Sequence, residues 1–296
     1  MKKIWILHHL TNINSYENIK LLEAFTNVGI DAKIYVPKYF DVIVSKNQNR
    51  SIRYKGEILE FPDLILSRTG SGSNYSTLAL MRQFESFNIT IINDSSSVSI
   101  VLDKLLTSQL LIKENLPVPK TILIDNDTDI NLIEEEIGFP CVIKATTGSK
   151  GKTVYLCKSK SEFKKLIDLL SSISLKKILI VQEFINAVPG KDLRVWVIGG
   201  KTVAAMKRTG PAGDFRANIS NGGTAENFEI TEEIDFISRE TARVLGLQIA
   251  GIDLLFTETG FSICEANSSP GFEGMDKYCG TDMSQKVAEF IKLKLN

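Results

Sequence analysis

Two acidic side chains near the carboxyl end of the sequence have the spacing of paired residues in a β-hairpin. Residues 248–256 and 261–267 read as apolar strands, and the Glu-Thr-Gly loop between them centres on Thr259. This centre places Asp253 opposite Glu265 on one face, with Cβ atoms about 5 Å apart. Carboxylates this close in an apolar sheet repel each other, so we expect a cation or a proton between them. Without a cation, the pKa of one carboxyl is expected to rise.

Asn267 completes a candidate metal site with these two acids. It lies two residues beyond Glu265 and therefore shares its face of the strand. Oxygen donors from Asp, Glu and Asn suit magnesium or manganese better than zinc. The alternative is an exposed hairpin with scattered acids, and the apolar residues around Asp253 argue against it.

A segment rich in lysine and glycine has the character of a phosphate-binding loop. Residues 144–153 read KATTGSKGKT, in which small residues expose backbone N–H groups and lysines add positive charge. A P-loop would need glycine at Thr146 and a helix afterwards, but residues 154–157 read as a strand. We therefore predict a glycine loop between two antiparallel strands. A plain surface turn is the alternative.

Two weaker signals accompany this loop. Residues 182–185 end a predicted strand, and such a hinge can offer backbone hydrogen bonds to the edge of an adenine. Five basic residues follow within about two dozen positions and indicate an anionic ligand. They are Arg194, Lys201, Lys207, Arg208 and Arg216. Solvated strand edges are the alternative interpretation of this run.

The elements that position these residues begin with a small parallel α/β unit over about the first 95 residues, because predicted strands alternate there with helices. The strands are expected at 4–7, 32–36, 64–66 and 90–92. Ser15 is the predicted N-cap of the first helix and Gly29 its stop. Apolar residues recur at helical spacing in this helix: Ile19, Leu22, Phe25 and Val28.

The rest of the chain is predicted to form two further parts. Residues 103–113 are helical, and Pro117 and Pro119 then mark a boundary. A compact α+β module follows up to about residue 182. The last third reads as a hairpin-rich sheet with helices near 232–245 and 284–293.

The composition excludes several classes of protein. The 296 residues carry 35 basic and 35 acidic side chains, and 43% are hydrophobic. These values exclude a disordered chain, a collagen and a histone-like polycation, so phosphate binding should be local. No apolar run approaches the roughly 20 residues of a membrane helix, and the first apolar run is too short for a signal peptide. The four cysteines contain no C-x-x-C pair, which indicates reduced thiols in the cytoplasm.

In this order, the motifs resemble the ATP-grasp ligases, and among them the RimK-type glutamate ligase family. The resemblance covers nearly the whole chain. Its most specific parts are the Asp-Phe-Arg-x-Asn run at 214–218 and the Glu-x-Asn-x-Ser-Pro-Gly run at 265–271. Matching segments also occur at 62–70, 80–85, 103–105, 181–185 and 190–194.

The resemblance implies a fold and a division of the chain. The fold class is α/β (α+β), an ATP-grasp fold with an amino-terminal Rossmann-like pre-ATP-grasp unit. The expected parts are an amino-terminal domain at 1–95, a linker helix and central lid at 96–184, and a carboxy-terminal subdomain at 185–296. ATP is expected between the last two parts.

The resemblance also implies roles for individual residues. Lys144 and Arg216 are the expected catalytic residues, and Asp253, Glu265 and Asn267 the metal ligands. The implied ATP-binding residues are Lys104, Lys144, Gly148, Ser149, Gly151, Gln182, Glu183, Phe184, Ile185, Asp192, Arg216 and Asn218. Candidate substrate residues are Arg68, Arg194, Arg208 and Ser269.

The implied activity is an ATP-dependent, ADP-forming carboxylate–amine ligation with Mg²⁺ or Mn²⁺, expected as two ions. A substrate carboxylate attacks the γ-phosphorus of ATP, and the amine of an amino acid, expected to be L-glutamate, displaces phosphate from the acylphosphate. The expected acceptor is a protein carboxy terminus, as in ribosomal protein modification. A small-molecule or coenzyme acceptor, and a catalytically inactive nucleotide-binding regulator, remain alternatives. A cytoplasmic homo-oligomer, dimer or tetramer, is expected, with neither nucleic acid nor membrane as a partner.

Overall fold

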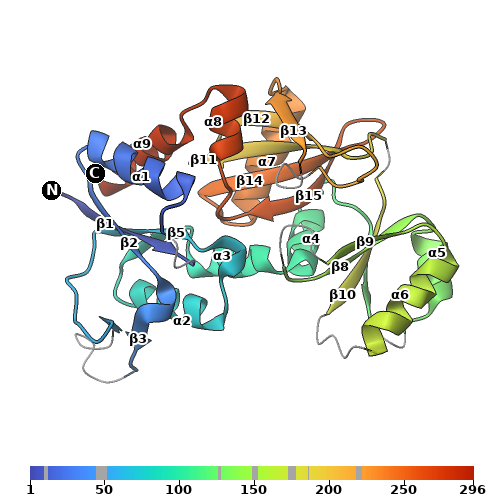
Figure 1. Ribbon diagram of the computed structural model, residues 1–296, viewed down its shortest axis with the longest axis horizontal. Coiled ribbons are helices and arrows are strands. Elements are labelled where there is room, and N and C mark those ends of the chain that lie inside the picture. Colours follow the sequence, from blue (N-terminus) through green and yellow to red (C-terminus); the bar gives the residue numbers. More distant parts are fainter. Residues whose placement is uncertain are drawn as a thin grey trace.

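The computed structural model describes residues 1–296 except 10–12, 45–51, 126–127, 149–152, 173–177, 186 and 218–221. Three sheets of four, four and five strands organise these residues, and a two-stranded hairpin accompanies the first sheet (Figure 1). No helix among the described residues has the length and apolar character needed to cross a membrane.

The first sheet is the predicted parallel unit, with strand order β2-β1-β5-β6. Its strands are β1 (Lys3–His8), β2 (Asp31–Tyr35), β5 (Leu64–Arg68) and β6 (Thr90–Ile92). The helices of this part are α1 (Tyr16–Asn27), α2 (Tyr75–Glu85) and α3 (Ser95–Leu102), with short turns η1 (Pro37–Tyr39) and η3 (Gly70–Gly72). The hairpin of β3 (Phe40–Val42) and β4 (Ile52–Tyr54) and the helix α3 were not predicted.

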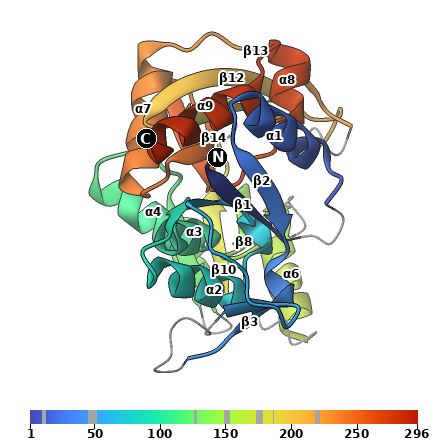
Figure 2. The same ribbon diagram turned by 90° about the vertical axis from the view of Figure 1, so that its left-hand side faces the viewer.

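Helix α1 begins and ends as predicted, and its buried face overlaps the spaced apolar residues in part, because Phe25 is buried and Leu22 and Val28 pack against the core. The Ser15 side chain accepts a hydrogen bond from the backbone N–H of Asn18, and Gly29 has a φ of +79°. The buried residues of α1 are Asn18, Leu21, Ala24 and Phe25. Ile19 is 46% exposed, because the helix packs on the sheet and on α9 (Met283–Leu295) with the adjacent stripe (Figures 1 and 2).

The second sheet is antiparallel with strand order β7-β10-β8-β9. Its strands are β7 (Thr121–Ile124), β8 (Cys141–Ala145), β9 (Val154–Cys157) and β10 (Leu179–Glu183), and its helices are α5 (Ile130–Glu136) and α6 (Lys160–Ser172). The lysine and glycine segment therefore joins two antiparallel strands, as predicted. Part of it, residues 149–152, lies outside the described residues.

The third sheet is antiparallel with strand order β13-β12-β11-β14-β15. Its strands are β11 (Lys191–Ile198), β12 (Lys201–Thr209), β13 (Thr224–Asn227), β14 (Ile249–Phe256) and β15 (Phe261–Asn267). The helices of this part are α7 (Glu232–Val244), α8 (Glu273–Cys279) and α9, and α4 (Lys104–Lys113) connects the first and second sheets along the chain.

One face of the third sheet has an apolar half and a charged half. Side chains alternate along each strand, so Trp196 and Arg194 share a face of β11, and Met206 and Arg208 share that face of β12. The apolar half packs into one core with Ile4, Phe25 and other residues of the first sheet and α1. The charged half is left for the site described next.

Candidate functional site

A cavity of about 350 Å³ lies between the second and third sheets. Its floor is the charged half of the third sheet, and its other walls come from β8, β10 and the beginning of α4. Ser71 of the first unit and the segment Ser269–Gly271 line one end. Lys144 and Glu265 line this one cavity, as the predicted arrangement requires.

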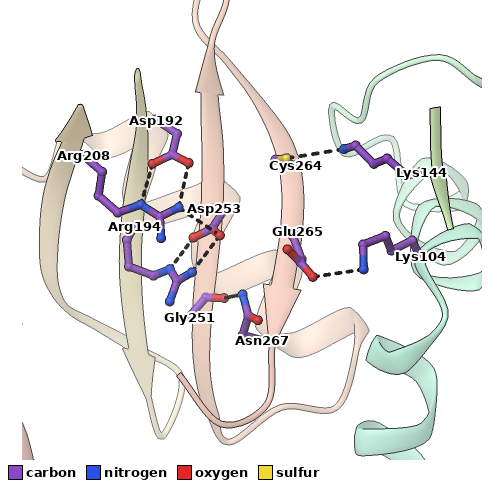
Figure 3. A network of polar contacts seen from close by, with 10 residues as sticks. All are labelled: Lys104, Lys144, Asp192, Arg194, Arg208, Gly251, Asp253, Cys264, Glu265 and Asn267. Atoms are coloured by element: carbon purple, nitrogen blue, oxygen red, sulfur yellow. Dashed lines mark hydrogen bonds and ion pairs between the residues drawn. The ribbon is translucent and has the colours of Figure 1, made fainter. Parts of the chain in front are cut away.

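Two arginines and two aspartates form a buried ion-pair network on the floor (Figure 3). The Arg208 guanidinium donates from Nε and Nη2 to the two oxygens of Asp192, both at 2.6 Å. Its Nη2 also lies 3.0 Å from Oδ2 of Asp253. Arg194 donates to Asp253 through Nε and through Nη2, the latter at 2.8 Å. The charges of the four groups cancel.

This network overturns the expected repulsion between Asp253 and Glu265. Burial alone would raise the pKa of the Asp253 carboxyl, but the charges of Arg194 and Arg208 outweigh it and lower the pKa. Glu265 has its own cation, since its Oε1 lies 3.2 Å from Nζ of Lys104. Protein side chains therefore compensate both acids, and the prediction that one pKa rises is wrong for Asp253.

The predicted pairing of the acids is confirmed, although the loop is not the predicted one. Asp253 is the register partner of Glu265. Closer to the turn the register shifts, and Thr257 donates its backbone N–H to the carbonyl of Gly260 at 2.9 Å. The turn is thus one residue shorter than predicted, and a β-bulge at Cys264 restores the pairing at Glu265.

Asp253, Glu265 and Asn267 form a donor set that fits a hard divalent cation. Asn267 is the register partner of Gly251, and its amide Nδ2 lies 3.5 Å from the Gly251 carbonyl oxygen. That contact uses the amide nitrogen and leaves the side-chain oxygen as a donor. Within the described part of the chain, no group of three His, Cys, Asp or Glu side chains could hold a metal ion. An ion at this place would therefore need an oxygen of another kind, such as the side-chain oxygen of Asn267.

Two lysines face these donors from the opposite wall (Figure 3). Lys104 begins α4 directly after its N-cap, Asp103, and its Nζ lies 3.1 Å from the carbonyl oxygen of Gly148. Lys144 of β8 places Nζ 3.8 Å from Sγ of Cys264. Both ammonium groups therefore lie beside Glu265, where they suit a polyanion such as a phosphate chain.

The far end of the cavity is more apolar. Phe184 and Phe215 meet edge to face with ring centroids 6.0 Å apart, and both line the cavity. The Glu183 carboxylate accepts a hydrogen bond from the backbone N–H of Lys120 at 2.9 Å. Arg216 pairs with Asp214 at 2.9 Å at this end. Aromatic rings beside strand-end backbone suit the flat base of a nucleotide.

Comparison with known proteins identifies the family. A model described as RimK-like ATP-grasp domain matches residues 101–291, and one described as RimK PreATP-grasp domain matches residues 2–98. The chain belongs to the RimK-like ATP-grasp family. The predicted family and its amino-terminal pre-ATP-grasp unit are therefore confirmed.

Individual relatives agree with this membership. A probable alpha-L-glutamate ligase of Trichodesmium erythraeum is 35% identical over 288 residues, which cover 96% of this chain and 95% of the relative. A structure of the ATP-grasp ligase PsnB, complexed with a phosphomimetic variant of minimal precursor, Mg, and ADP, has a TM-score of 0.75 at 18% identity, covering 99% and 98% of the chains. An ATP-grasp RimK domain protein from Sphaerobacter thermophilus has a TM-score of 0.74 at 18% identity, covering 97% and 98%. The predicted ATP-grasp fold is confirmed.

The structure brings most of the predicted site residues of this RimK-like chain to one cavity. Those that line it are Lys104, Lys144, Gly148, Gln182, Glu183, Phe184, Ile185, Asp192, Arg194, Arg208, Arg216, Asp253, Glu265, Asn267 and Ser269. Three further predicted residues lie outside the described residues: Ser149, Gly151 and Asn218.

Arg68 is the exception. It is buried behind the cavity wall, where its Nη1 donates to the Pro270 carbonyl at 2.9 Å and its guanidinium lies 5.8 Å from the centre of the Phe272 ring. Burial lowers the pKa of Arg68 to about 10. Pro270 lies between Arg68 and the cavity, so this geometry does not provide the predicted contact of Arg68 with substrate.

Sequence reasoning assigned no role to three other residues of the site. Phe215 lies inside the Asp-Phe-Arg-x-Asn run, and Ser71 lies in the glycine loop after β5, so motif position was an available signal for both. Cys264 was interpreted only as a buried thiol. Its place in the bulge depends on strand pairing that a single sequence does not display.

Proposed function

We propose that this protein is an ATP-dependent carboxylate–amine ligase that adds L-glutamate to a carboxylate acceptor through an acylphosphate. One observation carries the proposal: Lys104 and Lys144 face Asp253, Glu265 and Asn267 across one cavity. This arrangement offers cations for phosphate oxygens beside oxygen donors for a metal. The relatives named as probable alpha-L-glutamate ligases support glutamate as the amino acid.

Each part of the cavity has a task in this reaction. Asp253, Glu265 and Asn267 would hold magnesium or manganese, and the ion would offset the charge that develops during phosphoryl transfer. Lys104 and Lys144 hold phosphate oxygens from the opposite wall. The Phe184 end orients the adenine, so the γ-phosphorus points toward the donors and lysines. Positioning and neutralisation of this kind supply most of the catalysis in phosphoryl transfer.

The acceptor and the amine must enter at the end opposite the adenine. Ser71, Ser269 and Gly271 line that end, and Arg194 lies beside it on the floor. A carboxylate there reaches the γ-phosphorus, and phosphate leaves when the glutamate amine attacks the acyl carbon. We propose a protein carboxy terminus as the acceptor, which agrees with a structure of the neighbour PsnB complexed with a precursor peptide.

Further details of the proposal rest on the family resemblance. They are two metal ions, domains at 1–95, 96–184 and 185–296, and a homo-oligomer, dimer or tetramer. The four cysteines are free thiols, which supports work in a reducing compartment such as the cytoplasm.

The test is release of phosphate from ATP with glutamate alone and then with candidate acceptors, followed by mass spectrometry of each acceptor. We expect phosphate release that depends on both substrates, and acceptors that gain one or more glutamyl units. If only small molecules gain glutamyl units, the acceptor is a small molecule and not a protein carboxy terminus. If the protein binds nucleotide but releases no phosphate with any pair of glutamate and acceptor, the proposed ligase activity is contradicted.

A further inference from the structure

The segment from Ser268 to Gly271 leads directly from the metal-ligand candidate Asn267 to the open end of the cavity. Ser269, Pro270 and Gly271 line that end. Any shift of this segment therefore moves both the metal donor before it and the surface that meets the acceptor.

Side chains of the first unit hold this segment from behind. Asn93, at the end of β6, donates from Nδ2 to the carbonyl of Ser268 at 2.8 Å. Arg68, at the end of β5, donates from Nη1 to the carbonyl of Pro270 at 2.9 Å. Gly70 supports the residue between them, since a Cβ on Gly70 would lie 3.0 Å from Cβ of Ser269. Three consecutive residues of the segment thus rest on the first unit.

Asn93 also ties the segment to the beginning of β14. The same Nδ2 donates to the carbonyl of Ile249 at 2.7 Å, and Oδ1 accepts from the backbone N–H groups of Gln248 at 2.7 Å and Ile249 at 3.1 Å. Asn93 is 1% exposed, so these four hydrogen bonds satisfy a buried amide. One side chain therefore fixes the distance between β14, which carries Asp253, and the end of β15, which carries Asn267.

The other side of the segment is closed by β14 itself. A Cβ on Gly251 would lie 2.6 Å from Cβ of Pro270, so the segment fits between Gly70 and Gly251 without room for a side chain at either position. Arg68 is a buried cation that donates a hydrogen bond to a neutral carbonyl and also feels the charge of Glu17. A hydrogen-bonded carbonyl compensates a buried charge less well than a hydrogen-bonded carboxylate does. Its placement is better explained by the position of Pro270 than by stability of the fold.

We propose that Arg68 and Asn93 are positioning residues that set the acceptor end of the cavity and the metal donor Asn267 by holding the backbone at Ser268 and Pro270. The inference rests on the proposed function. It assigns the pre-ATP-grasp unit a task in the reaction that needs no contact between Arg68 or Asn93 and substrate.

The test uses Asn93→Asp in the full-length protein. The substitution preserves the size and both acceptor bonds at residues 248 and 249. It replaces the nitrogen that donates to the carbonyls of Ser268 and Ile249 with an oxygen. We expect the magnesium concentration for half-maximal activity, and KM for the acceptor, to rise about tenfold, as for other partners that orient metal ligands. KM for ATP at saturating magnesium should change less than about twofold, because the adenine end is untouched.

Ser97→Ala is the matched control. Ser97 is buried in the first unit and donates to the carbonyl of Gly246 at 2.8 Å, so it ties the same two parts together away from the segment. We expect Ser97→Ala to lower the melting temperature, with unchanged magnesium dependence and KM values. Equal kinetic effects from Ser97→Ala and Asn93→Asp would overturn the proposal, because the role of Asn93 would then be structural only.

Arg68→Lys and Arg68→Met provide a second route if Asn93→Asp does not fold. The lysine keeps a cation and a donor for Pro270, so it should retain acceptor KM within about threefold of wild type, whereas methionine should raise it about tenfold. Identical KM values for the two would contradict the inference. Calorimetric titration with magnesium and a non-hydrolysable ATP analogue distinguishes failure of the proposed function from failure of the positioning role. If the wild-type protein does not bind them, the proposed function is refuted. If Asn93→Asp binds them as tightly as the wild type does, only the positioning role is refuted.

Discussion

Arg208 compensates two buried carboxylates at once, Asp192 and Asp253. Replacing it by methionine keeps most of the volume but leaves both acids without that cation. Arg194 donates its hydrogen bonds to Asp253 and acts on Asp192 through its charge without such a bond. Removing one partner of a buried ion pair costs about 3–5 kcal/mol. We therefore expect Arg208→Met to lower the free energy of unfolding by at least about 3 kcal/mol in urea denaturation.

An exposed ion pair gives the comparison for this loss. Arg239 lies 3.4 Å from Asp235 on α7, and both side chains are more than one-third exposed. Arg239→Met should cost less than about 1 kcal/mol. A loss of that small size for Arg208→Met would mean that the network on the cavity floor is solvated.

Glu265→Gln tests the metal donor set. The amide keeps the size but removes a charge, so we expect phosphate release to be lost together with the rise in melting temperature that magnesium and ATP produce. The repulsion expected between the Asp253 and Glu265 carboxylates predicted that the ligand-free Glu265→Gln variant would lose no stability. Because Lys104 loses its partner at 3.2 Å, we now expect a loss of up to about 1 kcal/mol. An active variant with the full ligand-induced rise would disprove the metal assignment.

Lys144→Ala and Arg216→Ala test the groups aimed at phosphate. Each removes a cation that acts during phosphoryl transfer, and the loss of one such group commonly lowers turnover by about 10²–10³-fold. Folding should change little, because the contact of Lys144 Nζ with the Cys264 thiol at 3.8 Å is weak and Arg216 pairs with Asp214 near the surface. Phosphate release and melting curves of both variants check this; wild-type turnover would exclude the roles.

At the scale of residues, the sequence was informative where the strand period alone decides the outcome. The opposition of Asp253 and Glu265 follows from alternation across a hairpin, and it is present. The cations that compensate them were not predictable as partners. Arg194 lies on β11, which pairs with β14, and Arg208 lies on β12, one strand further along the sheet, and the fold sets this strand order. The same reason applies to Arg68, whose environment comes from Pro270 and Phe272, about 200 residues away.

At the scale of elements, the contact between α1 and α8 depends on a tyrosine. Tyr16 donates its hydroxyl hydrogen to Oδ2 of Asp276 at 3.0 Å. Burial and this hydrogen bond raise the pKa of Tyr16 to about 12, against 10.0 for a free tyrosine. Since the folded pKa is the higher one, the stabilisation is complete below pH 10 and is lost as pH rises from 10 to 12.

Tyr16→Phe should remove that part of the pH dependence. Urea denaturation at pH 9 and pH 11 is expected to show a larger loss of stability on the alkaline side for wild type than for the phenylalanine variant. Other groups titrate in both proteins, so the difference between them isolates the hydroxyl. Parallel pH curves would show that the hydrogen bond to Asp276 does not stabilise the fold.

Elements with clear local signals were predicted and others were not. Ser15 and Gly29 mark the ends of α1 through capping and positive φ, which depend on adjacent residues only. Its buried stripe overlaps the spaced apolar residues only in part. Leu21 and Leu22 are equally apolar, and the packing of α9 decides which of them is fully buried. The bulge at Cys264 similarly carries no marker in the sequence.

At the scale of the whole molecule, the first and third sheets share one apolar core, whereas the second sheet has its own. Residues of β1, α1, β11, β12 and α8 form the shared cluster, with Trp196 and Phe272 among its largest members. The second cluster draws on residues 122–181. The two parts that flank the lid in sequence are therefore one packed body.

Removing residues 1–95 should consequently damage the third sheet although no strand of it is deleted. The exposed apolar face around Trp196 and Phe272 is an aggregation surface. We expect the truncated chain to elute as aggregates in size-exclusion chromatography and to lack a cooperative melting transition. A monomeric fragment with a cooperative transition would show that the shared core is dispensable.

The division of one sheet face into an apolar half and a charged half also affects the response to ionic strength. Ions in solution screen exposed charges over about 10 Å at 0.1 M salt, but they have little access to groups buried against an apolar core. The Asp192, Arg208, Asp253 and Arg194 network, with side chains 7–13% exposed, is of this second kind. Added salt therefore weakens the attraction of the cavity for a dissolved polyanion while the floor that receives it keeps its shape.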